Sequence, residues 1–231
     1  NVYTIFEGFA WLGLAALAVG ITIIAGEFDL SVGSAAAVAG ILAMMLIGDL
    51  GLIPTILVVA LIGMAFGLIQ GMLIYRLRIA SLVFTLGSLI GLRGLAFVIS
   101  GENTVVMPNL ELAKTIKQQL WILSPFSLTT LGIFLLVGLF LRYHRYGREI
   151  FAIGGGRNEA IAAGVPLARP LIIAFGLSGT IAAITGALLS VKSGSAAPQG
   201  FENLLLPAVT AALIGGVSLF GGSGSILGTL I

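Results

Sequence analysis

The chain of 231 residues contains no cysteine, and charged residues make up only 9% of it. The absence of cysteine excludes disulfides, cysteine-ligated zinc and iron–sulfur centres. Soluble domains carry about 25% charged residues, so an ordinary water-soluble domain is excluded as well. His144 is the single histidine, stands among arginines and has no second metal ligand at a usable spacing. The net charge of +2 is too small to indicate a nucleic-acid partner.

Apolar sequence is what the chain has in abundance, with 58% hydrophobic residues and a mean hydropathy of +1.17. Apolar runs of about 20 residues, enough for a helix to cross a bilayer, recur along it. The alternation of a membrane barrel is absent. We therefore expect an all-α transmembrane bundle forming one domain over residues 1–231. About seven segments are expected, some short or broken: 9–26, 32–47, 52–75, 79–99, 121–141, 171–191 and 204–219. Because the sequence starts at Asn1 and stops in apolar sequence, we expect further segments beyond both ends.

The stretch 142–170 is a basic loop between two apolar runs. It holds five of the eleven Lys and Arg residues: Arg142, Arg145, Arg148, Arg157 and Arg169. By the positive-inside rule it faces the cytoplasm, together with Arg76 and Arg78. Lys114, Lys117 and Lys192 fall on the other side. The middle of the loop predicts a short helix that follows a glycine hinge at 154–156 and stops at Gly164 and Pro166.

A break in the apolar sequence at 26–34 separates the first two expected segments. Glu27 and Asp29 interrupt the run, so this stretch lies either at the inner interface or in a buried break. Asp29 and Ser31 can cap the next helix, whose first amides need acceptors. Acids at membrane depth are costly, so a cation or solute contact is the alternative role.

Two further features have a structural and a functional interpretation. Gly63, Gly67 and Gly71 lie on one helix face and predict close helix packing, and Gly87 with Gly91 repeats the spacing. Arg93 lies inside a segment, where it can snorkel to the interface, pair with an acid or meet a solute.

No residue pattern for catalysis, metal binding or nucleotide binding is present, and GxxxxGK followed by Ser or Thr is absent. We therefore expect no enzyme activity and no cofactor or metal in this chain. If ATP powers the protein, another chain hydrolyses it.

Three runs of sequence, in order, carry a family resemblance: GEFDLSVGS at 26–34, IGGGRNEAIAAGV at 153–165 and LIGGVSLFGGSGSILGT at 213–229. Together they resemble the permease subunit of bacterial ABC importers of the ribose and simple-sugar type, which are related to branched-chain amino-acid permeases. The resemblance implies an inner-membrane permease dimer, identical or mixed, with two cytoplasmic ATPase subunits and a periplasmic solute-binding protein.

The resemblance also implies roles for single residues. Arg157, Asn158, Glu159, Ala160 and Gly164 match the loop whose short helix docks on the ATPase, which makes 142–170 a coupling loop. The Glu-to-Gly spacing is one residue shorter than the usual form, and Ile161 stands where a second Ala is common. Asp29, Ser31 and Gly33 match the other family signature, for which helix capping is the role we expect.

The expected function is therefore passage of a small sugar through an ABC permease. A branched-chain amino acid is the alternative cargo. An ion-coupled secondary transporter that uses Asp29 is the rival mechanism. A membrane-embedded enzyme is disfavoured because paired carboxylates and an activated nucleophile are lacking.

Overall fold

The computed structural model describes residues 2–109, 123–225 and 228. Within them most residues are helical and only four lie in strands. The helices are α1 (Val2–Ile24), α2 (Val32–Leu50), α3 (Leu52–Leu77), α4 (Ser81–Ser100), α6 (Pro125–Tyr143), α7 (Arg145–Gly155), α8 (Arg157–Ala162), α9 (Ala168–Ser193) and α10 (Leu205–Ile214). Two short strands, β1 (Val105–Val106) and β2 (Ser195–Ala196), pair in antiparallel fashion.

Six of the described helices are long and apolar enough to cross a membrane: α1, α2, α3, α4, α6 and α9. Helix α10 is a shorter apolar helix. The expected all-α bundle with about seven segments, some of them short, is thus confirmed. The expected end at 219 is wrong, since α10 stops at Ile214 and Gly216 turns the chain with a φ of +93°. Lys114, Lys117 and residues 121–122 of the fifth expected segment lie outside the described residues.

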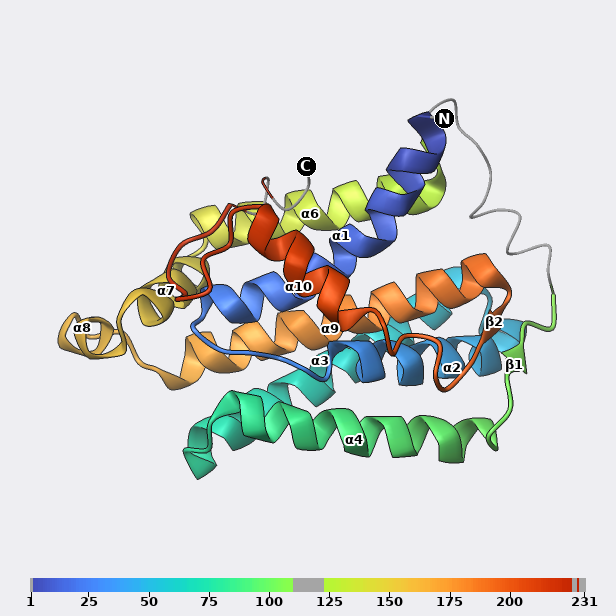
Figure 1. The fold of residues 1–231 in the computed structure, drawn as a ribbon, viewed down its shortest axis with the longest axis horizontal. Coiled ribbons are helices and arrows are strands. Elements are labelled where there is room, and N and C mark those ends of the chain that lie inside the picture. The colour runs from blue at the N-terminus through green and yellow to red at the C-terminus, as the bar shows by residue number, and fades with distance from the viewer. Residues whose placement is uncertain (1, 110–122, 226–227, 229–231) are drawn as a thin grey trace.

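Helix α9 forms the centre of the bundle and packs along α1, α2 and α3 (Figure 1). It is apolar or small on all sides, as expected for a helix surrounded by other helices. The outer faces of α3, α4 and α6 instead expose large apolar side chains such as Leu61, Val83 and Leu136. These faces suit contact with lipid acyl chains.

The glycines of α3 lie against α9. A Cβ added to Gly67 would collide with the carbonyl oxygen of Phe175, and one added to Gly63 would meet Gly179 and its neighbour Ala183. The two helices therefore approach at backbone contact, the geometry that such spacing allows. The same glycine spacing in α4 does not mark a close helix contact within the described residues. Nothing described lies within 4 Å of a Cβ added to Gly87 or Gly91.

Helices α2 and α10 both begin inside the bundle, and α10 is too short to cross it. Each follows an irregular segment that runs into the interior, residues 25–31 before α2 and 197–204 before α10 (Figure 1). At 1.5 Å per residue, the ten residues of α10 cover only ~15 Å of a hydrocarbon core about 30 Å thick. The break at 26–34 is buried within the protein at Glu27, Asp29 and Ser31, and Glu27 also borders a cavity at the end of the bundle that carries Arg76 and Arg78.

The two arginine-bearing turns lie at the same end of the bundle, here called the arginine-rich end (Figure 1). One cavity there is bordered by Arg76, Arg78 and Arg157. The basic loop contains two helices where the sequence predicts one. Helix α7 is missed because its arginines suggest a solvated loop, although Ile150 and Ile153 turn inward at helical spacing.

An ion pair closes the opposite end of the bundle. The Glu7 carboxylate of α1 accepts hydrogen bonds from Lys192 of α9 and from Ser124 and Ser127 at the start of α6. Ser124 also caps α6 by accepting a hydrogen bond from the Ser127 amide at 3.1 Å. Three helices are thereby joined around one buried carboxylate.

Candidate functional site

The three sequence runs that carry the family resemblance meet at one place near the arginine-rich end. The chain after α1, the end of α7 and the turn at 221–222 pack backbone to backbone here, and we call this contact the glycine junction. The Gly222 amide donates a hydrogen bond of 2.9 Å to the carbonyl oxygen of Ile24. A Cβ added to Gly154 would collide with that same oxygen and with the Gly222 nitrogen. Only glycine fits at 154.

Next to the glycine junction, Arg157 at the start of α8 forms an ion pair with Glu27. The Glu27 side chain is only 8% exposed, whereas that of Arg157 is 54% exposed. A buried carboxylate needs a partner, and this guanidinium supplies it. The pair ties the first residue of α8 to the irregular segment 25–31.

Deeper in the bundle, the Asp29 carboxylate accepts four hydrogen bonds. Ser31 donates from its amide at 3.0 Å and from its hydroxyl at 2.6 Å, and Gln70 of α3 donates at 3.2 Å. Ser178 of α9 donates to the other carboxylate oxygen at 2.8 Å. Asp29 is 3% exposed, so these donors replace the water it has lost. The site holds segment 25–31 against both α3 and α9.

This arrangement corrects the expected capping of α2. Ser31 does occupy the N-cap position, but its side chain accepts no hydrogen bond from the first turn of the helix. Its hydroxyl instead donates to Asp29, because that buried carboxylate has the stronger need for a donor. Gly33 of the same signature is required for a different reason: a Cβ there would lie 2.9 Å from the Phe201 carbonyl oxygen.

Helix α4 satisfies the backbone of the break. The Phe28 amide donates to the Ser81 hydroxyl, and the Thr85 hydroxyl donates to the Phe28 carbonyl, both at 3.1 Å. Non-helical backbone is tolerated at membrane depth only where protein or water satisfies it. Two polar side chains of α4 therefore allow the first two segments to be discontinuous.

Helix α8 stands at the far edge of the molecule (Figure 1). Arg157, Asn158 and Glu159 are exposed, and Ala160 is the residue that turns inward. The helix ends as predicted at Gly164, whose φ is +80°, and the Val165 amide returns to the Ala160 carbonyl at 2.9 Å. Gly156 separates α8 from α7, at the expected hinge.

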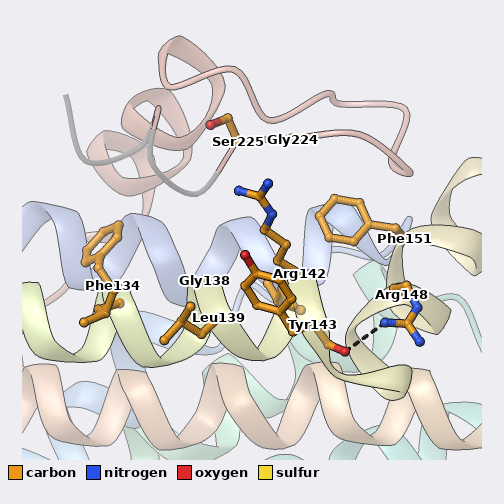
Figure 2. A pocket seen from close by; sticks show the side chains of 11 residues that line it. Phe134, Gly138, Leu139, Arg142, Tyr143, Arg148, Phe151, Gly224 and Ser225 are labelled. Atoms are coloured by element: carbon orange, nitrogen blue, oxygen red, sulfur yellow. Dashed lines mark hydrogen bonds between the residues drawn. The ribbon is translucent and has the colours of Figure 1, made fainter.

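Of the remaining arginines of the loop, Arg142, Arg145 and Arg148 lie along α6 and α7, and Arg169 lies in the first turn of α9. Arg142 and Arg148 border a cavity of about 560 Å³ between these helices and the segment at Gly224 and Ser225 (Figure 2). Arg148 donates to the Tyr143 carbonyl at 2.8 Å, and Arg145 pairs with Glu149 at 2.8 Å. Their charges thus lie at the surface of the arginine-rich end.

The partners of Glu27 and Asp29 were not identified from the sequence. Gln70 and Ser178 are single polar residues inside long apolar runs, and a lone Gln at membrane depth is a usable signal because an unsatisfied amide is costly there. Glu7 also escaped notice, because it lies near the start of the first run. Among the described residues, no cluster of His, Cys, Asp and Glu could hold a metal.

A helical bundle whose broken segments meet near the membrane interior is typical of membrane transport proteins. Residues 1–231 match the family described as "Branched-chain amino acid transport system / permease component", and the chain belongs to that family.

Three relatives show what the chain is similar to. It is 32% identical to the inner membrane ABC transporter permease protein YjfF of Escherichia coli K12, over 96% of this chain and 69% of that protein. It is 32% identical to the L-arabinose ABC transporter permease protein AraH of Azospirillum brasilense, over 100% and 68%. It is 31% identical to the autoinducer 2 import system permease protein LsrC of Yersinia pseudotuberculosis YPIII, over 94% and 63%. The chain thus spans about two thirds of these relatives. No solved structure matches it.

These findings confirm the expected resemblance to ABC permeases. They favour an ABC permease over the secondary transporter that the sequence left open, since the relatives named above are described as permeases of ABC transporters or of an import system. The expected inner-membrane location agrees with the six apolar helices and with the description of YjfF.

Proposed function

We propose that this chain is the membrane subunit of an ABC importer that carries a small sugar across the inner membrane. In this proposal a periplasmic binding protein delivers the solute, and cytoplasmic ATPase subunits drive its passage through a permease dimer. The family and the ABC relatives support the transporter class. The chain itself supplies no covalent chemistry and binds no cofactor, and ATP is consumed by the partner subunits.

A sugar cargo is favoured by the relative described as an L-arabinose permease. The family description, which names branched-chain amino acids, keeps leucine as the alternative cargo. Uptake of radiolabelled pentoses, hexoses and leucine into vesicles that contain the assembled transporter separates the two. We expect saturable uptake of one of the sugars. Uptake of leucine alone would show that the cargo is a branched-chain amino acid and not a sugar.

The coupling part of the proposal is carried by one observation: α8 stands outside the bundle while its first residue, Arg157, is ion-paired with Glu27 inside it. A short helix with small residues can seat closely in a groove of the ATPase. Ala160 and Gly164 would keep its shape, and the exposed Ile161 would supply apolar contact. The loop 142–170 thus acts as the coupling loop, with α8 as its docking element.

Movement of α8 would reach the solute path through contacts already described. Arg157 passes displacement to segment 25–31 at Glu27, and Asp29 passes it on to α3 through Gln70 and to α9 through Ser178. Close packing makes such elements shift as units rather than deform. Closure of the ATPases would then rearrange the broken helices and expose the path to alternate sides of the membrane.

Co-purification tests the docking step. Deletion of residues 157–164, or the single change Ile161→Glu, is expected to leave the permease in the membrane but to abolish its association with the ATPase. Tyr143→Glu is the matched control, since it puts the same charge at another exposed position of the arginine-rich end. Normal ATPase stoichiometry with the deleted chain would show that α8 is not the docking element.

A further inference from the structure

Residues 197–204, together with Arg93 of α4, form a polar face, which we call the Glu202 face. The segment leaves β2 and runs into the bundle without helical structure (Figure 1). It reaches α2 at Gly33, whose added Cβ would lie 2.9 Å from the Phe201 carbonyl oxygen. Gly33 precedes the end of α2 at Leu50 by 17 residues, which is ~25 Å of helix at 1.5 Å per residue. The segment therefore reaches α2 near its first turn, well inside the bundle.

The exposed side chains of this segment are polar. Gln199, Glu202 and Asn203 are exposed, and Glu202 forms an ion pair of 2.9 Å with Arg93. Both side chains of the pair remain about 40% exposed. Arg93 precedes the end of α4 at Ser100 by seven residues, or ~10 Å of helix, which places the pair below the membrane surface.

Lipid is unsuited to cover such a face. Irregular backbone and half-exposed charges do not face hydrocarbon, because polar groups there find no partner for their hydrogen bonds. The outer face of α3 differs, since its exposed residues Leu57 and Leu61, each 59% exposed, are apolar. The Glu202 face must therefore meet water or a polar ligand.

We infer that the Glu202 face lines the aqueous solute path and that Arg93 and Glu202 bind the hydroxyl groups of a sugar there. The inference rests on the proposed function and names the residues that would contact its solute. The ion pair joins one oxygen of Glu202 to one nitrogen of Arg93. Within the described residues, the second carboxylate oxygen and the other guanidinium N–H groups are left to accept from and donate to neighbouring hydroxyls. Ser34 borders the same small cavity and adds a hydroxyl.

Accessibility is the first test, and a chain without cysteine suits it. Asn203→Cys and Leu61→Cys are made singly in the assembled transporter, and a charged thiol reagent is added to open membrane sheets. Asn203→Cys is expected to react, and a transported sugar is expected to slow it at least threefold. Leu61→Cys should react only after denaturation. If Asn203→Cys also reacts only after denaturation, protein covers the face and the inference is wrong.

Uptake kinetics are the second test. Arg93→Gln, Glu202→Gln and the exchanged pair Arg93→Glu with Glu202→Arg are each expected to raise the KM for the sugar at least tenfold. A pair that only joins α4 to the segment would recover when exchanged, so a wild-type KM in the exchanged variant overturns solute contact. A wild-type transporter that carries no sugar would refute the proposed function instead, while the labelling result would stand.

Discussion

Arg157 and Glu27 are 130 residues apart in the sequence and form an ion pair beside the glycine junction. The pair joins the element proposed to meet the ATPase to the break that divides α1 from α2. It is therefore a direct link between α8 and the irregular segment 25–31.

Loss of this pair is expected to weaken coupling rather than folding. Glu27→Gln and Arg157→Gln should each lower ATP-driven uptake roughly tenfold, the effect of about 1.4 kcal/mol, with normal amounts of protein in the membrane. Arg157 is more than half exposed, so solvent screens the pair and a larger effect is not expected. The measurement is uptake rate against ATPase rate in the reconstituted complex. If both variants instead lose binding of the ATPase to the same extent, the lower uptake would come from failed docking, which would contradict a role of the pair in transmission.

The glycine junction makes a sharp prediction for two adjacent residues. Gly154→Ala places a methyl group on the Ile24 carbonyl oxygen, so the apparent Tm of the purified protein should fall by several degrees, as expected for a loss of about 1–3 kcal/mol. Gly155→Ala is the matched control, because its Cβ would meet the Gly222 Cα only at an ordinary 3.7 Å. Equal apparent Tm values for Gly154→Ala and Gly155→Ala would contradict this prediction.

The same logic applies to α3. Gly67→Ala should push α3 away from α9 and cost about 1–3 kcal/mol, because the Phe175 backbone cannot move aside cheaply. Gly87→Ala on α4 has open space in the described part of the chain and should be neutral or slightly stabilising. Thermal unfolding in detergent compares the two, and a destabilised Gly87→Ala would point to a partner helix on that face.

Substitutions of Asp29 distinguish an ABC permease from an ion-coupled transporter. Asp29→Asn keeps an acceptor oxygen for Ser31 and Gln70, so most ATP-driven uptake should remain, whereas Asp29→Ala removes all four hydrogen bonds and should destabilise the protein by about 2–4 kcal/mol. Uptake by the wild type should persist with an uncoupler and stop without ATP. A transporter coupled through Asp29 would show the reverse: no uptake by Asp29→Asn, and collapse with the uncoupler.

The long helices could be predicted because an apolar run of about 20 residues has few other stable states in a membrane. The helix end at Gly164 followed from glycine's access to positive φ. Contacts between distant segments could not be predicted. Nothing in the sequence around Glu27 indicates Arg157, and the hydroxyl of Ser178 resembles any serine of an apolar helix until packing brings it to Asp29. Helix α7 was missed because basic residues outnumber its inward isoleucines.

The central claim is that α8 contacts the ATPase on the cytoplasmic side, and site-specific cross-linking tests it most directly. A single cysteine is placed at the exposed Asn158, with Glu102→Cys as the control at the opposite end of the bundle. The complex is then treated with a short thiol-to-amine cross-linker, with and without ATP. The account predicts a permease–ATPase product for Asn158→Cys alone, in a yield that changes with ATP. A product from Glu102→Cys, or labelling of Asn158→Cys by an impermeant reagent from outside intact cells, would contradict it.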